Sequence, residues 1–391
     1  MVNMDKAGAS VLMVLESVFP SQGGGGAESQ VRTLGRHMMG HRLDVSVVVP
    51  MVSYGPQREQ DHVDGIAVVR LAYPKLPILG ALSMLGKLCW LLYRRRREYA
   101  VIHAHIAGNM AAVSCLMGRL LGKPVVVKLT GMTEMQGGIL DPRPSCVTRL
   151  KKLALRCASY YQATSSRIGR MLVDSGFDHA KVRLIPNAVD TDRFARVERD
   201  FDLRQQLCGD RPLAGIYVGR LVPEKGLELL LDGWARVFRD RRDATLILVG
   251  DGRLRGPLAE RAQTLGIGDQ VRFVGPSDSV ERYLAVADFG VLTSLSEGLS
   301  NTLLEYMAAG LPVVGSRVSG TEDFVKSGET GWLFEPGDLD DFERAMRAVA
   351  DAPAGVLAHM GEEARKLVVS RASIAAVVDQ LTHLYGMFPI A

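Results

Sequence analysis

Short apolar runs rich in β-branched residues recur along this chain, and stretches with helical spacing separate most of them. Such runs predict buried parallel strands, and their alternation with helices is typical of a doubly wound α/β sheet. This alternation of strands and helices stops after residue 187 and begins again at residue 213, which predicts two such domains. The predicted strands are 11–16, 44–50, 68–71, 101–105, 125–130, 160–165 and 182–187, then 213–219, 245–250, 271–275, 289–294 and 312–317.

The length of 391 residues also favours two domains over one core. We predict an N-terminal domain over 1–195 and a C-terminal domain over 196–371. The stretch 187–209 mixes charges with few apolar residues and is interpreted as the linker between them.

A run of glycines that includes Gly24, Gly25 and Gly26 follows the first predicted strand. Without Cβ atoms, such a loop lets backbone amides approach a phosphate oxygen, although a plain flexible turn is the alternative. The nicotinamide-binding fingerprint does not fit, because Ser29 stands where its last glycine is needed.

The stretch 296–312, SEGLSNTLLEYMAAGLP, follows a predicted strand and opens a helix. The amides of Thr302 and Leu303, at a helix start after the N-cap type Ser300, would form an anion site at the carboxyl end of the sheet. Glu297 and Glu305 flank this site. A carboxylate repels phosphate, so we interpret both as acceptors of hydrogen bonds from sugar hydroxyls.

Two cations follow the first strand of the second domain, in the stretch GRLVPEKG. Arg220 can grip two phosphate oxygens as a fork, while Lys225 acts as a point charge. The stretch lacks the G-x-x-x-x-G-K-[ST] pattern, so it is not a P-loop.

These two motifs together resemble those of the family-4 retaining glycosyltransferases. The resemblance rests on Glu297, seven residues, Glu305 and the following Met-Ala-Ala-Gly-Leu-Pro-Val-Val, and on the Gly-Arg, four residues, Lys-Gly stretch. It implies the GT-B fold, two Rossmann-like doubly wound domains facing a cleft, with a last helix in 372–391 that crosses back to the first domain. It further implies transfer of a hexose, with retention, from a nucleotide-diphosphate sugar, UDP before GDP, to a glycan or lipid-linked acceptor.

The resemblance also assigns the residues. Glu297, Arg220 and Lys225 are the catalytic set, and no metal or other cofactor is expected. A phosphorylase or sugar-phosphate synthase of the same fold, or a transferase acting on a small natural product, is the alternative. The predicted donor-binding residues are Gly24, Gly25, Gly26, Val274, Gly298, Leu299, Ser300, Thr302, Leu303 and Glu305.

On the acceptor side, the family usually carries a Thr-x-His-Gly-like turn, and here Thr130 stands at the histidine position. Thr130 offers one hydroxyl in place of an imidazole. His105 is expected near the acceptor and His103 to be structural. The two histidines have no third ligand at a recognisable spacing, so a metal site is not predicted.

The charge is unevenly divided, since residues 1–195 hold 25 Lys and Arg against 14 Asp and Glu, and the remainder holds 22 against 29. A basic first half suggests an anionic acceptor or an anionic membrane surface. Residues 76–97 are apolar and end in four arginines, which fits either a helix packed on the sheet or one lying on a membrane.

Other features of the sequence bear on the cellular location of the protein. The five cysteines show no framework or C-x-x-C pair, and the first apolar run contains Glu16 and leads to no cleavage site. We therefore expect a cytoplasmic protein without a signal peptide, at most attached to the inner face of the cell membrane. A nucleic-acid partner is not expected, because no recognition motif accompanies the basic half.

Overall fold

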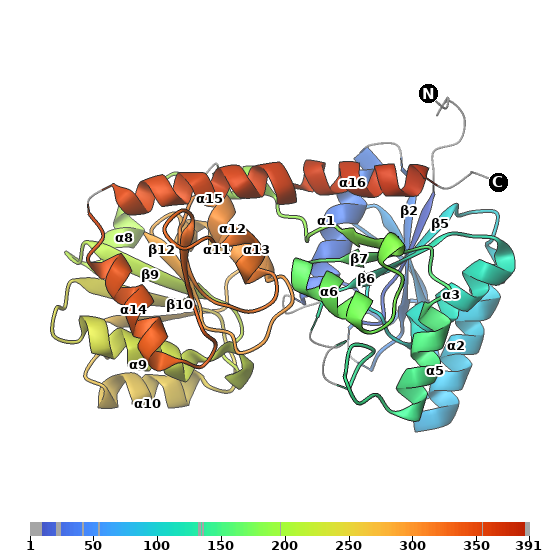
Figure 1. Ribbon diagram of the computed structural model, residues 1–391, viewed down its shortest axis with the longest axis horizontal. Coiled ribbons are helices and arrows are strands. Elements are labelled where there is room, and N and C mark those ends of the chain that lie inside the picture. Colours follow the sequence, from blue (N-terminus) through green and yellow to red (C-terminus); the bar gives the residue numbers. More distant parts are fainter. Residues whose placement is uncertain are drawn as a thin grey trace. The chain divides into compact units, whose positions relative to one another are not determined.

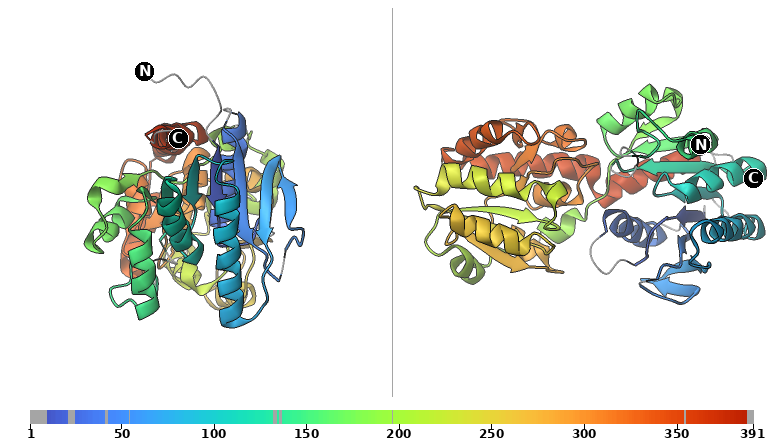
Figure 2. Two further views of the ribbon diagram at one scale, coloured as in Figure 1. Left: turned by 90° about the vertical axis from the view of Figure 1, so that its right-hand side faces the viewer. Right: turned by 90° about the horizontal axis from the view of Figure 1, so that it is seen from below.

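The computed structural model describes residues 10–20, 25–40, 43–53, 55–131, 134, 137–195, 197–353 and 355–387. The chain forms two compact units (Figures 1 and 2). Unit 1 contains the described residues up to Ala188 together with those from Ile374 onward, and unit 2 is Val189–Ser373. The division lies seven residues before the predicted boundary at 195, and the last helix belongs to unit 1.

Unit 1 is built on a sheet to which the described residues contribute eight strands, in the order β3-β4-β2-β1-β5-β6-β7-β8. Neighbours are parallel except β3 and β4, which are antiparallel. The strands are β1 (Val11–Val14), β2 (Val45–Pro50), β3 (Gln60–Val63), β4 (Ile66–Leu71), β5 (Val101–Ala104), β6 (Val125–Leu129), β7 (Tyr160–Ala163) and β8 (Val182–Leu184). The helices are α1 (Gly26–Gly40), α2 (Pro77–Arg94), α3 (Asn109–Leu121), α5 (Cys146–Leu155), α6 (Ser166–Asp174), the 3-10 turn η1 (His179–Lys181) and α16 (Ile374–Gly386).

Helices cover both faces of this sheet, which is why its central strands are mostly apolar. Val11 and Met13 of β1 belong to a core shared with α1 and α16. Leu12 and Val14 point the other way, into a core shared with α2, α3 and α5. The stretch 76–97 thus forms a helix packed on the sheet, as one of the two interpretations had it. None of the helices in the described part of the chain is long and apolar enough to cross a bilayer.

Unit 2 is built on a parallel sheet of six described strands, in the order β11-β10-β9-β12-β13-β14. The strands are β9 (Leu213–Val218), β10 (Ala244–Val249), β11 (Val271–Gly275), β12 (Phe289–Leu292), β13 (Val313–Ser316) and β14 (Gly331–Phe334). The helices are α7 (Thr191–Ala195), α8 (Phe201–Cys208), η2 (Pro223–Lys225, a 3-10 turn), α9 (Leu227–Phe238), α10 (Arg255–Thr264), α11 (Val280–Leu284), α12 (Asn301–Ala308), α13 (Thr321–Phe324), α14 (Leu339–Ala350) and α15 (Val356–Ala372).

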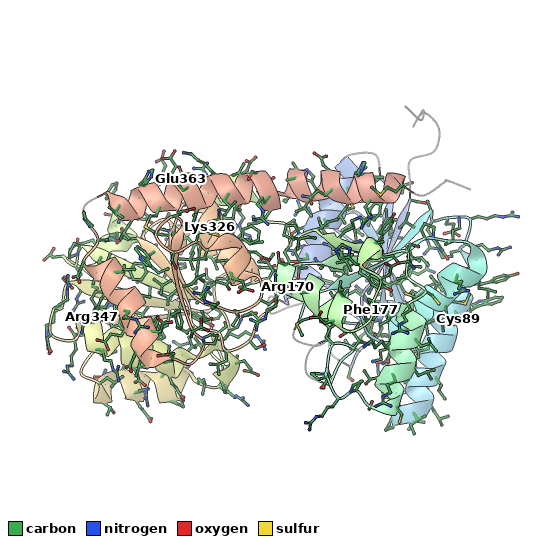
Figure 3. All side chains as sticks on the ribbon, viewed as in Figure 1. Cys89, Arg170, Phe177, Lys326, Arg347 and Glu363 are labelled. Carbon is green, nitrogen blue, oxygen red and sulfur yellow. The ribbon has the colours of Figure 1, made fainter. Side chains whose placement is uncertain are left out.

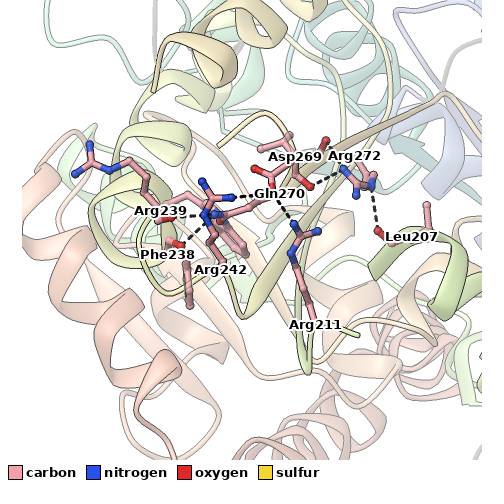
Figure 4. A network of polar contacts seen from close by, with 10 residues as sticks. Leu207, Arg211, Phe238, Arg239, Arg242, Asp269, Gln270 and Arg272 are labelled. Carbon is pink, nitrogen blue, oxygen red and sulfur yellow. Dashed lines mark hydrogen bonds and ion pairs between the residues drawn. The ribbon is translucent and has the colours of Figure 1, made fainter. Parts of the chain in front are cut away.

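A polar network holds the segment that precedes β11 (Figure 4). The buried Gln270 donates through Nε2 to the carbonyl of Phe238 at 3.1 Å and accepts from Trp234 Nε1 at 3.1 Å. Arg211 forms an ion pair with Asp269 at 2.6 Å. The Gln270 bonds tie the end of α9 to the amino end of β11, and the Arg211 ion pair ties the segment before β9 to the same place. The loops discussed below lie at the opposite, carboxyl edge of the sheet.

In each sheet the chain adds strands on one side of the first strand and then crosses to its other side. The chain places β10 and β11 on one side of β9 and then returns to add β12 on the other side, and in unit 1 β1 has β2 and β5 as its neighbours in the same way. A crevice opens beyond the carboxyl ends of the strands at such a switch point, and open α/β sheets bind ligands there.

The predicted doubly wound architecture is confirmed for both units, with three local differences. β3 and β14 were not predicted. The proposed linker 187–209 contains α7 and α8, whose buried residues Phe194, Leu203 and Cys208 join the core of unit 2.

Candidate active site

The loop after β9 carries both predicted cations. Arg220 is exposed, and its side chain makes no hydrogen bond or ion pair with any residue in the described ranges. Lys225 ends η2, and Gly226 follows at a φ of 63° before α9 begins. A Cβ at Gly226 would collide with the Thr293 carbonyl, so glycine lets this loop lie against the loop after β12.

The loop after β12 supplies the carboxylate that Lys225 contacts. Lys225 Nζ and Glu297 Oε1 form a partly buried ion pair, and Ser294 Oγ donates to the same oxygen at 3.0 Å. Two further bonds fasten the loops: Thr293 Oγ1 donates to the Lys225 carbonyl at 2.8 Å, and the Leu295 amide donates to the Glu224 carbonyl at 3.0 Å. The switch point of unit 2 therefore brings the two sequence motifs together.

Two buried tyrosines form the floor below these loops. Tyr306 of α12 accepts a bond from the Val218 amide at 2.6 Å, and Tyr217 donates to the Arg220 carbonyl at 2.9 Å. Burial raises the pKa of both phenols, and Glu297 raises that of Tyr217 further. Both hydroxyls stay protonated at neutral pH and fix the backbone on which Arg220 stands.

A third loop, after β10, supports the Arg220 loop from the other side. The Leu221 amide donates to the Asp251 carbonyl at 2.9 Å, and the Leu254 amide donates to the Leu221 carbonyl at 3.0 Å. Gly250, at a φ of 137°, lies so close to Gly219 that a Cβ there would overlap the Gly219 carbonyl. The Gly-Asp-Gly sequence at 250–252 was a local signal for this turn that the sequence analysis did not use.

Glu305 lies one helical turn into α12 and is half-buried. Burial above all, and Glu281 to a smaller extent, raise the pKa of Glu305 to about 7 against the opposing charge of Arg193. Arg193 is committed to an ion pair with Glu281 at 2.6 Å and a bond to the Asp278 carbonyl at 3.0 Å. The Glu305 carboxyl has no hydrogen bond or ion pair within the described residues, so its oxygens can accept bonds from a ligand.

The remaining donor-side predictions lie at the same sheet edge. Ser300 is the N-cap of α12, although its side chain does not cap the helix, and Thr302 and Leu303 form the first turn. Gly298 and Leu299 are buried in the preceding loop. Val274 lies near the end of β11, two strands from β9, where the register with β10 shifts.

The glycine loop belongs to unit 1, and Gly24 lies outside the described residues. Gly25 precedes α1 and Gly26 begins it. The Glu28 carboxyl accepts a bond from Ser17 Oγ and lies against Gly25, where a Cβ would overlap it. A carboxylate therefore occupies the space beside Gly25 in this structure.

The acceptor-side residues differ in their accessibility. His105 is completely buried, and neither of its ring nitrogens has a hydrogen bond in the described part of the chain. It therefore does not reach an accessible surface, although it was expected to meet the acceptor. Thr130 is half-buried, and its hydroxyl lies 3.5 Å from the buried carboxyl of Glu134.

His105 and His103 lie with Lys128 on one face of the sheet. The rings of His103 and His105 are 4.2 Å apart, and His103 Nδ1 lies 2.7 Å from the Tyr385 hydroxyl of α16. Burial lowers the pKa of His103 to about 3 and that of Lys128 to about 7. His103 is thus structural, as predicted. No group of three or more metal-ligating side chains occurs within the described ranges.

Comparison with known proteins agrees with this architecture. A model described as Glycosyltransferase Family 4 matches residues 24–193, and one described as Glycosyl transferases group 1 matches residues 213–352. The structure of HepE from Anabaena in complex with UDP aligns with a TM-score of 0.77 at 22% identity, covering 97% of this chain and 100% of that one. The fold is therefore GT-B, as predicted.

Curated relatives extend the comparison to activity. The alpha-D-kanosaminyltransferase of Streptomyces kanamyceticus is 28% identical, with 77% of this chain and 81% of that protein covered. The UDP-Gal:alpha-D-GlcNAc-diphosphoundecaprenol alpha-1,3-galactosyltransferase of Escherichia coli is 26% identical, with 74% and 76% covered. The chain belongs to the family-4, group 1 glycosyltransferases.

Proposed function

We propose that this glycosyltransferase moves a hexose, with retention of anomeric configuration, from a nucleotide-diphosphate sugar to a glycan or lipid-linked acceptor. One observation carries the proposal: the loop of Arg220 and Lys225 meets the loop of Glu297 at the switch point of unit 2, with Arg220 left without a charge partner among the described residues. UDP is favoured as the nucleotide, which agrees with the bound nucleotide of HepE and the donor in the name of the E. coli relative.

In this proposal the diphosphate binds Arg220 and Lys225, with the first turn of α12 contributing its amides at Thr302 and Leu303. Cations held in place before the reaction stabilise the negative charge that develops as the nucleotide departs. The same two cations do the work that a metal would otherwise do, so transfer is expected to persist in excess chelator.

In the unliganded protein Lys225 is paired with Glu297, so the diphosphate must compete with the Glu297 carboxylate for Lys225. When Lys225 turns to the diphosphate, the Glu297 carboxylate is released to accept bonds from hydroxyls of the transferred sugar, which orients the anomeric carbon. Glu305 accepts bonds from the ribose diol. We assign no residue as a covalent nucleophile, and the leaving phosphate takes the proton of the acceptor hydroxyl.

A thermal-shift panel of UDP, GDP, ADP and their glucose conjugates tests the donor class. The right nucleotide binds the native state and so raises the free energy of unfolding, by about 2.7 kcal/mol at a hundred times the dissociation constant. The melting temperature rises accordingly. We expect UDP and UDP-sugars to stabilise the wild type and not a variant with Arg220→Ala and Lys225→Ala. A panel in which no nucleotide stabilises the protein would contradict the proposal.

The acceptor and stereochemistry need separate measurements. Transfer to a polyprenyl-diphosphate sugar would support the lipid-linked class, while transfer only to a soluble aminocyclitol would favour the natural-product alternative, to which the kanosaminyltransferase relative points. Proton coupling constants of the first-formed product distinguish retention from inversion.

A further inference from the structure

The outward faces of α2, α3 and α5 carry exposed apolar side chains where a soluble layer would be polar. These helices pack side by side, α3 between the other two, and their inner faces share one core on the same face of the sheet. None of the residues in these three described helices is acidic. The layer is therefore apolar and basic, and its outer side has no covering element among the described residues.

α2 shows the pattern most clearly. Its inner face buries Gly80, Met84, Leu88 and Leu92. On the opposite face Leu79, Leu82 and Trp90, at positions i, i+3 and i+11, are 63%, 62% and 62% exposed. A helix that is apolar on both faces is expected to contact a second apolar phase with its outer face. No neighbouring helix among the described residues covers the outer face of α2.

α5 buries Leu155 in the core and also exposes an apolar face. Val147, Leu150 and Leu153 are 72%, 70% and 60% exposed and lie on one face. Lys152 is instead half-buried, with its ammonium group 5.7 Å from the ring centre of Phe177, which Figure 3 labels. Burial and Arg156 lower the pKa of Lys152. Three exposed apolar side chains on one face beside a half-buried lysine are not an arrangement that water alone favours.

Cations border this apolar surface. Arg94 and Arg97 at the end of α2 and Arg149 on α5 are exposed and make no ion pair with any residue that the structure describes. On α3, Leu116 and Leu120 continue the exposed apolar surface between the two flanking helices. Exposed apolar side chains beside unpaired arginines are the combination that lies at an anionic lipid interface.

We propose that the outer surface of α2, α3 and α5 binds an anionic bilayer, with the apolar side chains at the acyl boundary and the arginines at the headgroups. A second copy of this chain fits the surface less well, because a two-fold interface would set one acid-free basic face against another. Trp90 and Tyr93 suit the bilayer interface, where amphipathic rings concentrate. This inference does not rest on the proposed function, because it uses no residue of the donor site.

Vesicle sedimentation tests the surface without any donor present. We expect binding to vesicles of phosphatidylglycerol and phosphatidylcholine, and little to phosphatidylcholine alone. Arg94→Gln with Arg97→Gln should lower the partition coefficient about fivefold per charge. Leu150→Ser with Leu153→Ser should lower it about tenfold or more. Phe201→Ser in unit 2 is the matched control, since Phe201 is 76% exposed but lies elsewhere, and it should bind like the wild type.

Trp90 provides a local probe of insertion. Trp234 is fully buried and Trp332 lies in unit 2, so Trp90 is the exposed tryptophan of the three. Its emission should shift to the blue on addition of phosphatidylglycerol vesicles, and Trp90→Phe should abolish the shift.

Three results would overturn the inference. One is failure to bind anionic vesicles at low salt. Another is binding that the leucine variants leave unchanged. The third is wild-type self-association, seen by analytical ultracentrifugation, that the same leucine variants abolish, which would make this face an interface between copies. Circular dichroism of each variant shows that it is folded.

Discussion

The switch points of the two units have the same topology and use their polar residues differently. In unit 2, Arg220 has no charge partner among the described residues and the Glu305 carboxyl has no bonded partner there, while Lys225 and Glu297 form an ion pair with each other and Ser294 also donates to Glu297. In unit 1, the Glu16 carboxyl after β1 accepts bonds from the Met110 amide at 2.9 Å and from Asn109 at 3.2 Å, at the start of α3. At the switch point of unit 2, polar side chains remain able to bond a ligand. At that of unit 1, the Glu16 carboxylate is already bonded to the protein itself.

The buried carboxyl of Glu134 in unit 1 is likewise bonded within the fold. Glu134 accepts bonds from the Gly131 amide at 2.9 Å and the Ala107 amide at 3.3 Å, and so joins the loops after β6 and β5. The comparison teaches that the position of a loop in a Rossmann-like sheet does not make it a binding site. What matters is whether the charges of the loop are already satisfied within the chain, and this difference supports the proposal that the donor binds at unit 2.

The largest expected effect follows from removing both cations of unit 2. Arg220→Ala with Lys225→Ala should lower kcat/KM for transfer about 10³-fold or more, because two preorganised charges at the leaving group are lost. Initial rates with the donor found in the thermal-shift panel measure this. Arg239→Ala, at the far end of α9, is the matched control and should leave the rate unchanged. Turnover near wild type in the double variant would refute the diphosphate role.

The second effect separates catalysis from nucleotide binding at Glu297. Glu297→Gln should lower kcat about 10²-fold, since the sugar loses its charged acceptor. The dissociation constant of free UDP should stay equal or fall, because Lys225 no longer pairs with a competing carboxylate. Calorimetry with UDP and initial rates give the two numbers. Weaker UDP binding in this variant would mean that Glu297 supports the nucleotide instead; Glu228→Gln, exposed on α9, serves as the control.

The third effect is a pH dependence of donor binding that arises from Glu305. Its pKa of about 7 means that the ionised acceptor forms between pH 6 and 8. UDP-glucose, whose phosphates do not titrate in this range, should therefore bind more tightly as the pH rises. Glu305→Gln should remove the dependence and weaken binding about tenfold at pH 8.

Glu281→Gln sharpens this test because it changes the pKa of Glu305 without touching the ligand. It removes one negative charge near Glu305 and releases Arg193 from its ion pair. Both changes lower the pKa of Glu305, so the pH midpoint of UDP-glucose binding should move down. A midpoint that stays in place would show that another group titrates.

The sequence predicted the strands and motifs whose signals are local. The apolar runs of β9 and β12 and the spacing of Glu297 and Glu305 could be read from single segments. β3 could not, because its residues are polar and half-exposed and it pairs only at the sheet edge. α7 and α8 were taken for a linker because so few apolar residues, Phe194, Leu203 and Cys208, anchor them.

Contacts across the sheet were equally hidden from the sequence. The bond from the Val218 amide to the Tyr306 hydroxyl joins residues 88 positions apart, and no spacing announces it. The sequence also did not show that the apolar faces of α2 and α5 point outward. Periodicity shows that apolar residues share a helix face, but not which face the protein covers. The apolar character of 76–97 was visible, and its second exposed side was not.

The smallest effect lies in the buried cluster of unit 1, where Lys128 Nζ has no hydrogen-bond partner among the described residues. Lys128→Met should raise the free energy of unfolding by about 1–3 kcal/mol near pH 6, since an unpaired buried amine is removed. The pKa of Lys128 is lowered to about 7, so the unfolded state binds its proton more strongly up to pH 10.5. Wild-type stability should therefore rise between pH 7 and 10.5 through this group, and the variant should lose that slope.

Urea denaturation at several pH values measures both the gain in stability and its pH dependence. Lys326→Met, at an exposed position, is the control. A destabilised Lys128→Met variant would mean that the amine has a partner in solution.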